Sequence, residues 1–204
     1  MSIYLIRHGE TALNASRTLQ PADTPLSERG RLQAAAIARR LVDGGVVAIV
    51  SSDLPRAAET ASAIAEACGL PIHWEPLLHE RNFGALRGRP YDGLSFDPLT
   101  LIDAPPGGES AATFRARVAE AFARMVALRA GLDGNLAVVT HGLVIGAILE
   151  THARLAAHDA LPERLGNASL TVLSAEPPHD VALLDCTRHL EGAAPDDAHS
   201  LSGG

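Results

Sequence analysis

The sequence predicts an α/β fold: a three-layer α/β/α sandwich around a mostly parallel central sheet. Two observations predict it. Short apolar runs typical of strands alternate with longer segments that keep helical spacing, and turn residues separate them. With 204 residues, of which 47% are hydrophobic, the chain can bury a core of sufficient size for one domain. We find no internal repeat and no linker that would divide it.

The first elements alternate strand and helix. They are expected at 2–6 (strand), 27–41 (helix), 46–50 (strand) and 54–67 (helix). Ser27 is a suitable N-cap for the first helix, and Gly44-Gly45 follow the end of that helix. The second helix keeps small apolar residues at helical spacing and is closed by Gly69. Its apolar positions are Ala57, Ala61, Ile64 and Ala65.

The later elements are expected at 71–78 (strand), 110–130 (helix), 135–140 (strand), 142–155 (helix), 168–174 (strand) and 181–187 (strand). One face of the helix at 110–130 is typical of a core contact. It consists of Phe114, Val118, Phe122, Met125 and Leu128. Residues 1–190 are thus expected to form a single domain. Residues 191–204 are polar, acidic and rich in turn residues, and are predicted to be a disordered tail.

Residues 84–108 are predicted to form a long loop. The segment is rich in Gly, Pro and Asp and shows no helical or strand periodicity. Long loops inside compact domains usually carry function or are disordered. Because this loop comes shortly after Glu80, a candidate site residue, we expect it to act as a lid on the substrate side.

Composition excludes several classes of function. All 17 basic residues are arginine, which rules out a Walker A phosphate loop and a Schiff-base lysine. The net charge of −7 argues against nucleic acid or an anionic membrane as a partner. An anionic substrate must then be attracted by a local cluster of arginines.

The sequence also gives expectations for location and for cysteine chemistry. No run of about 18 uncharged apolar residues occurs, and the first strand starts without a basic leader region, so we expect a cytoplasmic protein. Cys68 and Cys186 lie far apart and outside any CxxC pattern. Neither a disulfide framework nor a thiolate metal site is indicated.

Residues 5–11 read Leu-Ile-Arg-His-Gly-Glu-Thr and suggest a histidine that attacks phosphorus. An imidazole is a competent nucleophile near neutral pH, the Arg7 guanidinium can hold phosphate oxygens in a planar fork, and Gly9 lets the backbone approach an anion. Arg-His-Gly alone is a weak signal. However, Arg56, Glu80 and His141 each follow another strand-like run. Since ligands bind at the carboxyl ends of strands in open α/β sheets, these residues are expected to converge on one site.

Taken together, these segments resemble the histidine phosphatase superfamily, also called the phosphoglycerate mutase-like family. Six blocks carry the resemblance, in the family's order: Arg7-His8-Gly9-Glu10-Thr11 with Asn14; Asp23-Thr24-Pro25-Leu26-Ser27 with Gly30 and Gln33-Ala34; Ser51-Ser52-Asp53-Leu54 with Arg56-Ala57 and Thr60; Leu78-His79-Glu80 before Phe83-Gly84; Pro106-Gly107-Gly108-Glu109-Ser110; and Val139-Thr140-His141-Gly142. The resemblance covers roughly residues 3–175.

A set of roles follows for these residues. His8 would form a phosphohistidine, and the resemblance implies that its other ring nitrogen donates to a backbone carbonyl. Four groups would bind the phosphate oxygens together with Gly142 and do the work that a metal does elsewhere. They are Arg7, Asn14, Arg56 and His141. We therefore expect no metal and no cofactor, since two arginines would also repel a cation and no HExxH pattern occurs.

Glu80 is the expected general acid, which protonates the leaving oxygen and later serves as base for water. Burial would raise the pKa of this carboxyl and nearby cations would lower it, so the sequence does not fix the net direction. His79 is the candidate for the rim of the site. Contacts to the rest of the substrate are expected from Gln20, Arg81, Arg87 and Arg89.

Three functions stay open at this point. The preferred one is a metal-independent phosphomonoesterase for a small phosphorylated metabolite, and the runner-up is a cofactor-dependent phosphoglycerate mutase. Against the mutase, Phe83 stands where mutases tend to have tyrosine, Pro21 stands where the family often has glycine, and the mutase insertion is missing. The third is a regulatory module that binds a phosphorylated ligand with little turnover. The sequence leaves open the substrate's identity and whether the protein forms a homodimer.

Overall fold

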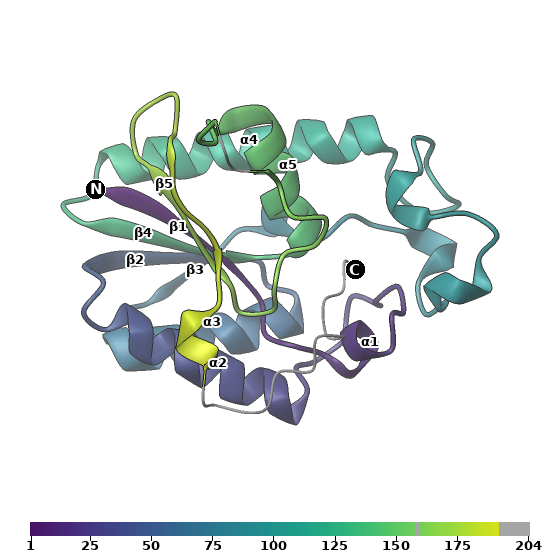
Figure 1. The fold of residues 1–204 in the computed structure, drawn as a ribbon, viewed down its shortest axis with the longest axis horizontal. Coiled ribbons are helices and arrows are strands. Elements are labelled where there is room, and N and C mark those ends of the chain that lie inside the picture. The colour runs from purple at the N-terminus through teal and green to yellow at the C-terminus, as the bar shows by residue number, and fades with distance from the viewer. Residues whose placement is uncertain (158–159, 192–204) are drawn as a thin grey trace.

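A six-stranded sheet with helices on both faces forms the centre of the molecule (Figure 1). The computed structural model describes residues 1–157 and 160–191. The strands are β1 (Ser2–Arg7), β2 (Val46–Ser51), β3 (Ile72–Trp74), β4 (Asn135–Thr140), β5 (Leu170–Ser174) and β6 (Val181–Cys186). The helices are α1 (Ala12–Ala15), α2 (Glu28–Leu41), α3 (Pro55–Cys68), α4 (Ala111–Ala130) and α5 (Gly142–His152). The predicted α/β fold is confirmed, and the predicted tail, apart from Glu191, lies outside the described residues.

The order of the strands in the sheet is β3-β2-β4-β1-β5-β6. The first four run parallel to one another, whereas β5 and β6 are antiparallel to their neighbours. In the register, Arg7 lies opposite Thr140 and Ser51 lies opposite Val139. The carboxyl ends of β1, β4 and β2 therefore meet at one edge, which is where open α/β sheets bind ligands.

The helices form one layer on each face of the sheet. Figure 1 shows α4 and α5 on one face and α2 and α3 on the other. On the first face, Phe114, Val118, Phe122 and Met125 are buried, as predicted for the stripe of α4. On the second face, the core includes Ile37 and Leu41 of α2, Ile64 of α3 and the sheet residues Ile6, Ile49 and Val139. Each such buried Leu, Ile or Phe side chain contributes about 1.5–3 kcal/mol of transfer free energy.

Helix ends follow the predicted capping residues at two places. The Ser27 hydroxyl accepts a hydrogen bond from the Gly30 N–H at 3.0 Å and so caps α2. Gly69 closes α3 with a φ of 67°, the left-handed conformation that glycine adopts without strain. No helix within residues 1–157 and 160–191 combines the length and the hydrophobicity that crossing a membrane requires.

Two predicted boundaries were wrong. β3 covers only Ile72–Trp74 of the strand expected at 71–78, because Pro76 has no N–H for the sheet and starts a 3-10 turn. The helix expected at 142–155 ends at His152. After it, the Arg154 backbone pairs with the chain at Asp180 in an isolated bridge, which an α-helix would not allow.

One predicted core position was also wrong. Leu128 is 39% exposed, whereas Arg129, in the same turn of α4, is buried. The Arg129 guanidinium donates to the Leu132 carbonyl at 2.7 Å, and this bond holds the arginine against the end of the helix. A binary apolar pattern does not anticipate such a bond.

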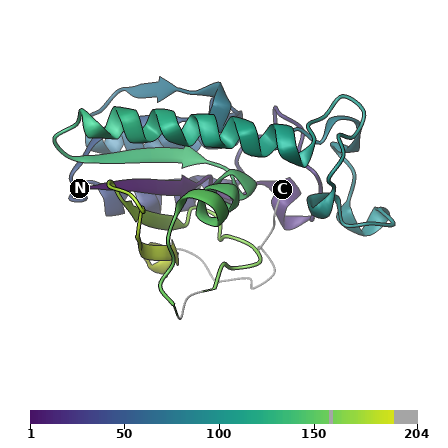
Figure 2. The same ribbon diagram turned by 90° about the horizontal axis from the view of Figure 1, so that it is seen from above.

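The 84–108 loop contains three 3-10 turns and lies beyond the first turn of α4 (Figure 2). Three backbone hydrogen bonds join it to residues 17–19: Gly88 N–H to Leu19 O at 2.7 Å, Leu19 N–H to Arg89 O at 3.0 Å and Tyr91 N–H to Arg17 O at 2.9 Å. Tyr91 packs with Leu19 and Phe83 in a small buried apolar cluster. The loop is thereby fixed next to the segment that follows β1.

Candidate active site

His8 follows directly after β1 and is fully buried. Its backbone N–H donates to the Thr140 carbonyl at 3.0 Å, which continues the pairing of β1 with β4. Its Nδ1 lies 2.7 Å from the Gly9 carbonyl. Because a carbonyl can only accept, Nδ1 carries the proton, and Nε2 keeps its lone pair. That Nε2 has no hydrogen-bond partner among the described residues. The contact of the other ring nitrogen with a backbone carbonyl is the one that the family resemblance implies.

His141 follows β4 and faces His8. The two ring centroids lie 5.2 Å apart with 60° between the ring planes. His141 Nε2 contacts the Ser52 hydroxyl at 2.8 Å, and its Nδ1 is buried without a partner among the described residues. Burial, followed by the positive charge of Arg56, lowers the pKa of both histidines well below the usual range. Both rings are therefore neutral at physiological pH, as a nucleophilic imidazole must be.

Arg7 and Arg56 bring two buried positive charges to the same edge of the sheet. Arg7 ends β1 and donates to the Leu165 carbonyl, and Arg56 lies in the first turn of α3 and donates to the Pro21 carbonyl at 3.4 Å. Burial lowers the pKa of each guanidinium to about 10, although the charge of Glu80 raises it. Both stay charged at neutral pH. Two buried guanidinium groups make this edge of the sheet positive, so it favours an anion.

Asn14 offers a further donor, and the backbone fixes which way its amide points. Asn14 Oδ1 accepts from the Thr11 N–H at 3.3 Å and from Asn167 Nδ2 at 3.2 Å. The same Asn167 Nδ2 donates to the His8 carbonyl at 3.3 Å. Because the Thr11 N–H can only donate and the His8 carbonyl can only accept, both amides are oriented. Asn14 Nδ2 is left as a buried donor without a partner among the described residues.

Glu80 is buried and held by two backbone N–H groups. Its Oε1 accepts from Arg81 N–H at 3.0 Å, and its Oε2 accepts from Leu143 N–H at 3.2 Å. Burial raises the pKa of the Glu80 carboxyl in spite of these bonds and of the positive charges of Arg56 and Arg7. The direction that the sequence left open is therefore upward, which favours a protonated acid.

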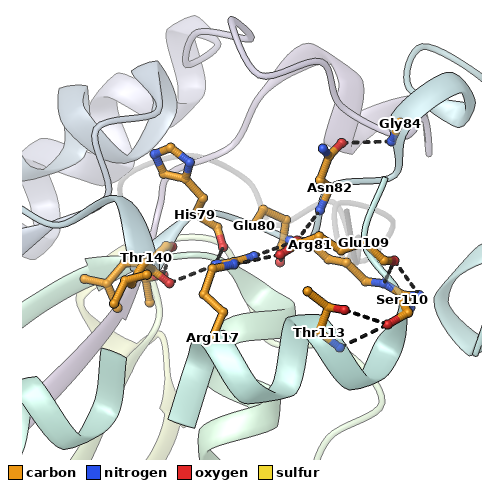
Figure 3. A network of polar contacts seen from close by, with 12 residues as sticks. His79, Glu80, Arg81, Asn82, Gly84, Glu109, Ser110, Thr113, Arg117 and Thr140 are labelled. Carbon is orange, nitrogen blue, oxygen red and sulfur yellow. Dashed lines mark hydrogen bonds and ion pairs between the residues drawn. The ribbon is translucent and has the colours of Figure 1, made fainter. Parts of the chain in front are cut away.

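A polar network holds the backbone on both sides of Glu80 (Figure 3). Arg117 of α4 donates to the Leu77 and His79 carbonyls, each at 2.8 Å, and forms a two-pronged ion pair with Glu109 at 2.8 and 2.7 Å. Glu109 also accepts from the Asn82 N–H at 2.9 Å. In Figure 3 the His79 ring points away from Glu80; it contacts Asp53 instead. The His79 ring thus turns away from the acid, while its charge is one of those that lower the pKa of His141 after burial and Arg56.

A family model described as the histidine phosphatase superfamily, branch 1, matches residues 3–184. The chain belongs to this superfamily. It is 38% identical over 181 residues to a Yersinia pestis protein named "Probable phosphoglycerate mutase", and the match covers 84% of this chain and 83% of that one.

Solved structures of the superfamily give a second comparison. The chain is 30% identical to a mycobacterial glucosyl-3-phosphoglycerate phosphatase, with a TM-score of 0.76 over 91% of this chain and 99% of that one. It is 28% identical to YhfR of Bacillus stearothermophilus, with a TM-score of 0.78 over 93% and 98% of the two chains. Names in the superfamily thus include both phosphatases and mutases.

The four residues predicted to contact the rest of the substrate lie in different surroundings. Gln20 is buried and accepts from the Thr11 hydroxyl at 2.7 Å. Arg81 donates to the Leu101 carbonyl at 2.7 Å and to the Glu109 carbonyl, so it ties the 84–108 loop to the chain at Glu80. Arg87 is half-buried, and its charge lowers the pKa of Arg56, whereas Arg89 is exposed.

The packing around the two glycines of the site differs. A Cβ on Gly9 would lie 2.4 Å from the Gly30 carbonyl oxygen, so the packing of this loop on the start of α2 requires glycine there. A Cβ on Gly142 would lie 3.4 Å from Arg7 Nε, which is an ordinary contact. Packing therefore explains Gly9, whereas it does not by itself explain Gly142.

Sequence reasoning missed three residues near the site. Asn167 orients Asn14, Arg117 holds the chain at Glu80, and Tyr91 lies close enough for the Glu80 charge to raise its pKa further, beyond the effect of burial. Asn167 is 153 residues away from Asn14 in the sequence, and Arg117 is 38 residues away from His79. No local pattern marks such contacts. Across residues 1–157 and 160–191, no group of three or more His, Cys, Asp and Glu side chains could hold a metal ion.

Proposed function

We propose that this chain is a metal-independent phosphomonoesterase that acts on a small phosphorylated metabolite through a phosphohistidine on His8. One observation carries the proposal: the buried Nε2 of His8 keeps a free lone pair, because Nδ1 is bound to the Gly9 carbonyl. Arg7 and Arg56 lie at the same edge of the sheet and favour an anion. Imidazole needs no further activation to attack phosphorus there.

In the first step, His8 Nε2 attacks phosphorus in line with the leaving oxygen. The N–P bond forms as the O–P bond breaks, and Glu80 gives its proton to the leaving oxygen, which departs as an alcohol. Arg7, Arg56 and the Asn14 amide would donate to the equatorial oxygens, over which charge is spread during transfer.

In the second step, water attacks the phosphohistidine. Glu80, now a carboxylate, takes a proton from the water as the new O–P bond forms and the N–P bond breaks. Inorganic phosphate leaves, and His8 and Glu80 return to their starting states. The raised pKa of the Glu80 carboxyl supports both roles, since it favours the protonated form for the first step and makes the carboxylate a stronger base for the second.

A mutase is the second candidate, because the Yersinia relative carries that name. A structural neighbour at 30% identity is named a glucosyl-3-phosphoglycerate phosphatase, and its structure is also known in complex with VO3, a mimic of transferring phosphate. Phe83, which offers no hydroxyl, also supports the phosphatase. The cytoplasmic location predicted from the sequence stays part of the proposal.

The deciding experiment is a panel of phosphorylated metabolites assayed with and without 2,3-bisphosphoglycerate. We expect release of inorganic phosphate without the bisphosphate, inhibition by vanadate, and unchanged rates in EDTA. Isomerisation of phosphoglycerate that requires the bisphosphate would instead establish the mutase. Loss of activity in EDTA that Mg²⁺ restores would refute the metal-independent mechanism.

A further inference from the structure

A cavity of about 270 Å³ lies between the 84–108 loop, the start of α4, one face of α5 and residues 161–165. Most of the side chains that line it are apolar. They include Leu99, Leu101, Phe114, Leu143, Leu149 and Leu161. A dry cavity of about 150 Å³ lined by Leu, Ile and Phe is enough to take up benzene, so a cavity of about 270 Å³ has room for a ring or an alkyl chain of about six carbons.

The cavity shares its walls with the proposed phosphate site. Leu143 lines the cavity, and its N–H donates to Glu80 Oε2 at 3.2 Å. Leu165 also lines the cavity, and its carbonyl accepts from Arg7. The atoms that extend from a leaving oxygen at Glu80 would therefore start next to the wall of this cavity.

The charged residues that line the cavity are three arginines and two glutamates: Arg81, Arg115, Arg164, Glu150 and Glu163. Arg81 donates to the Leu101 and Glu109 carbonyls, Arg115 lies 3.8 Å from Glu150 in an ion pair, and Arg164 also has an interaction partner. The two carboxylates offset most of the positive charge that a second anionic group would need. At the rim, Ile102 of the loop is 76% exposed and Leu161 is 37% exposed. Apolar side chains near the opening favour an apolar occupant.

We propose that this cavity holds the hydrocarbon part of the leaving group. The preferred substrates are then monophosphates of alcohols that carry an alkyl chain or a ring of about six carbons, rather than compounds with a second phosphate or carboxylate. The inference rests on the proposed function, because it assigns the cavity to the alcohol that Glu80 protonates.

Gly146 gives a way to fill the cavity from α5. It lines the cavity, and a Cβ built on it meets no atom within 4 Å. Alanine and leucine are both better helix formers than glycine, so neither substitution should harm the fold. Gly146→Leu would occupy much of the space, whereas Gly146→Ala, the matched control, adds one methyl group.

The test measures kcat/KM for methyl, butyl and hexyl phosphate. The leaving groups of butyl and hexyl phosphate have nearly equal basicity. A difference in kcat/KM between these two substrates therefore reports how well the cavity binds the alkyl chain. We expect wild-type kcat/KM to rise by up to about fourfold for each added methylene. Gly146→Leu should lose at least about tenfold on hexyl phosphate and less than about twofold on methyl phosphate, and Gly146→Ala should stay close to wild type.

Calorimetric titration with 1-hexanol gives a readout that does not need turnover. Wild type should bind 1-hexanol, and Gly146→Leu should not. Equal rates on butyl and hexyl phosphate, or an equal loss on methyl and hexyl phosphate in Gly146→Leu, would overturn the cavity proposal and leave the proposed function standing. Binding of hexanol without hydrolysis of any phosphate would overturn the proposed function, and with it the assignment of the cavity to a leaving group.

Discussion

The two halves of the candidate site are held in different ways. His8, Arg7 and His141 lie at or just after the ends of β1 and β4, where the register of the sheet sets their positions. Glu80 lies in irregular chain after a 3-10 turn, and hydrogen bonds with the side chains of Arg117, Glu109 and Thr140 help to hold that chain. The phosphate end of the site, with Arg7, His8 and His141, is therefore part of the sheet. The acid end, with Glu80, depends on side chains far away in sequence.

The largest effect is expected at the phosphate end. His8→Ala should lower the rate of phosphoryl transfer by a factor on the order of 10⁴ or more, because it removes the nucleophile. Quenching during turnover should trap an acid-labile, base-stable phosphoryl group on wild type and none on the variant. His73→Ala, at an exposed position of β3, is the matched control. Undiminished turnover in His8→Ala would remove the mechanism altogether.

At the acid end, the effect should depend on the leaving group. Glu80→Gln should slow phosphoenzyme formation from an alkyl phosphate by roughly 10²–10⁴-fold, because an alkoxide needs a proton to leave. It should affect p-nitrophenyl phosphate far less, since p-nitrophenolate leaves without one. Single-turnover measurement is required because Glu80 would also act in the second step. An equal loss for both substrates would mean that another group is the acid.

Arg56→Ala sharpens the contrast between the two ends. It should slow transfer from alkyl and p-nitrophenyl phosphate alike, by roughly 10²–10³-fold, because the equatorial oxygens that it would bind are common to both reactions. Arg56→Lys keeps the charge but loses the planar fork and should recover only part of the rate. If the loss differs between the two leaving groups, the two ends do not act separately.

A smaller effect is expected from the network around Glu80. Glu109→Gln weakens the two-pronged pair with Arg117 and should slow alkyl phosphates by about tenfold, because small displacements of an acid are costly. The affinity for vanadate, which reports the phosphate end, should not change. A parallel loss of vanadate affinity would break the distinction between a sheet-held end and a network-held end.

The smallest effect concerns stability against pH. His8 and His141 have folded-state pKa values below the unfolded value of about 6.5, so the unfolded chain binds more protons as the pH falls below that value. Their contribution to the free energy of unfolding is present at pH 7 and lost toward pH 5. His141→Gln should reduce this slope by up to about 1.4 kcal/mol per pH unit, measured by urea unfolding, and His73→Gln should not. An unchanged slope in His141→Gln would show that His141 does not titrate in this way.

The same contrast explains what the sequence could predict. The apolar runs identify the strands, and in an open α/β sheet polar residues after strands converge, so His8, Arg56 and His141 could be placed together in advance. The sequence could not predict the direction in which the pKa of the Glu80 carboxyl shifts. Burial and nearby charges act on it in opposite directions, and their relative size depends on the geometry of the site. The sequence could not predict the contacts of Arg117 either. They depend on how α4 packs against His79 and Leu77, which are 38 and 40 residues away in the chain.

The hydrogen bond between Asn14 and Asn167 has a consequence for the synthesis of the protein. Asn167 adds a second donor to the Asn14 oxygen beside the Thr11 N–H, so the phosphate-binding end is complete only when the chain has been made up to the start of β5. A nascent chain that already contains His8, Arg56, Glu80 and His141 would hold the Asn14 amide through the Thr11 N–H alone. Full affinity for phosphate would therefore emerge late in translation, after the residues that take part in the reaction have been made.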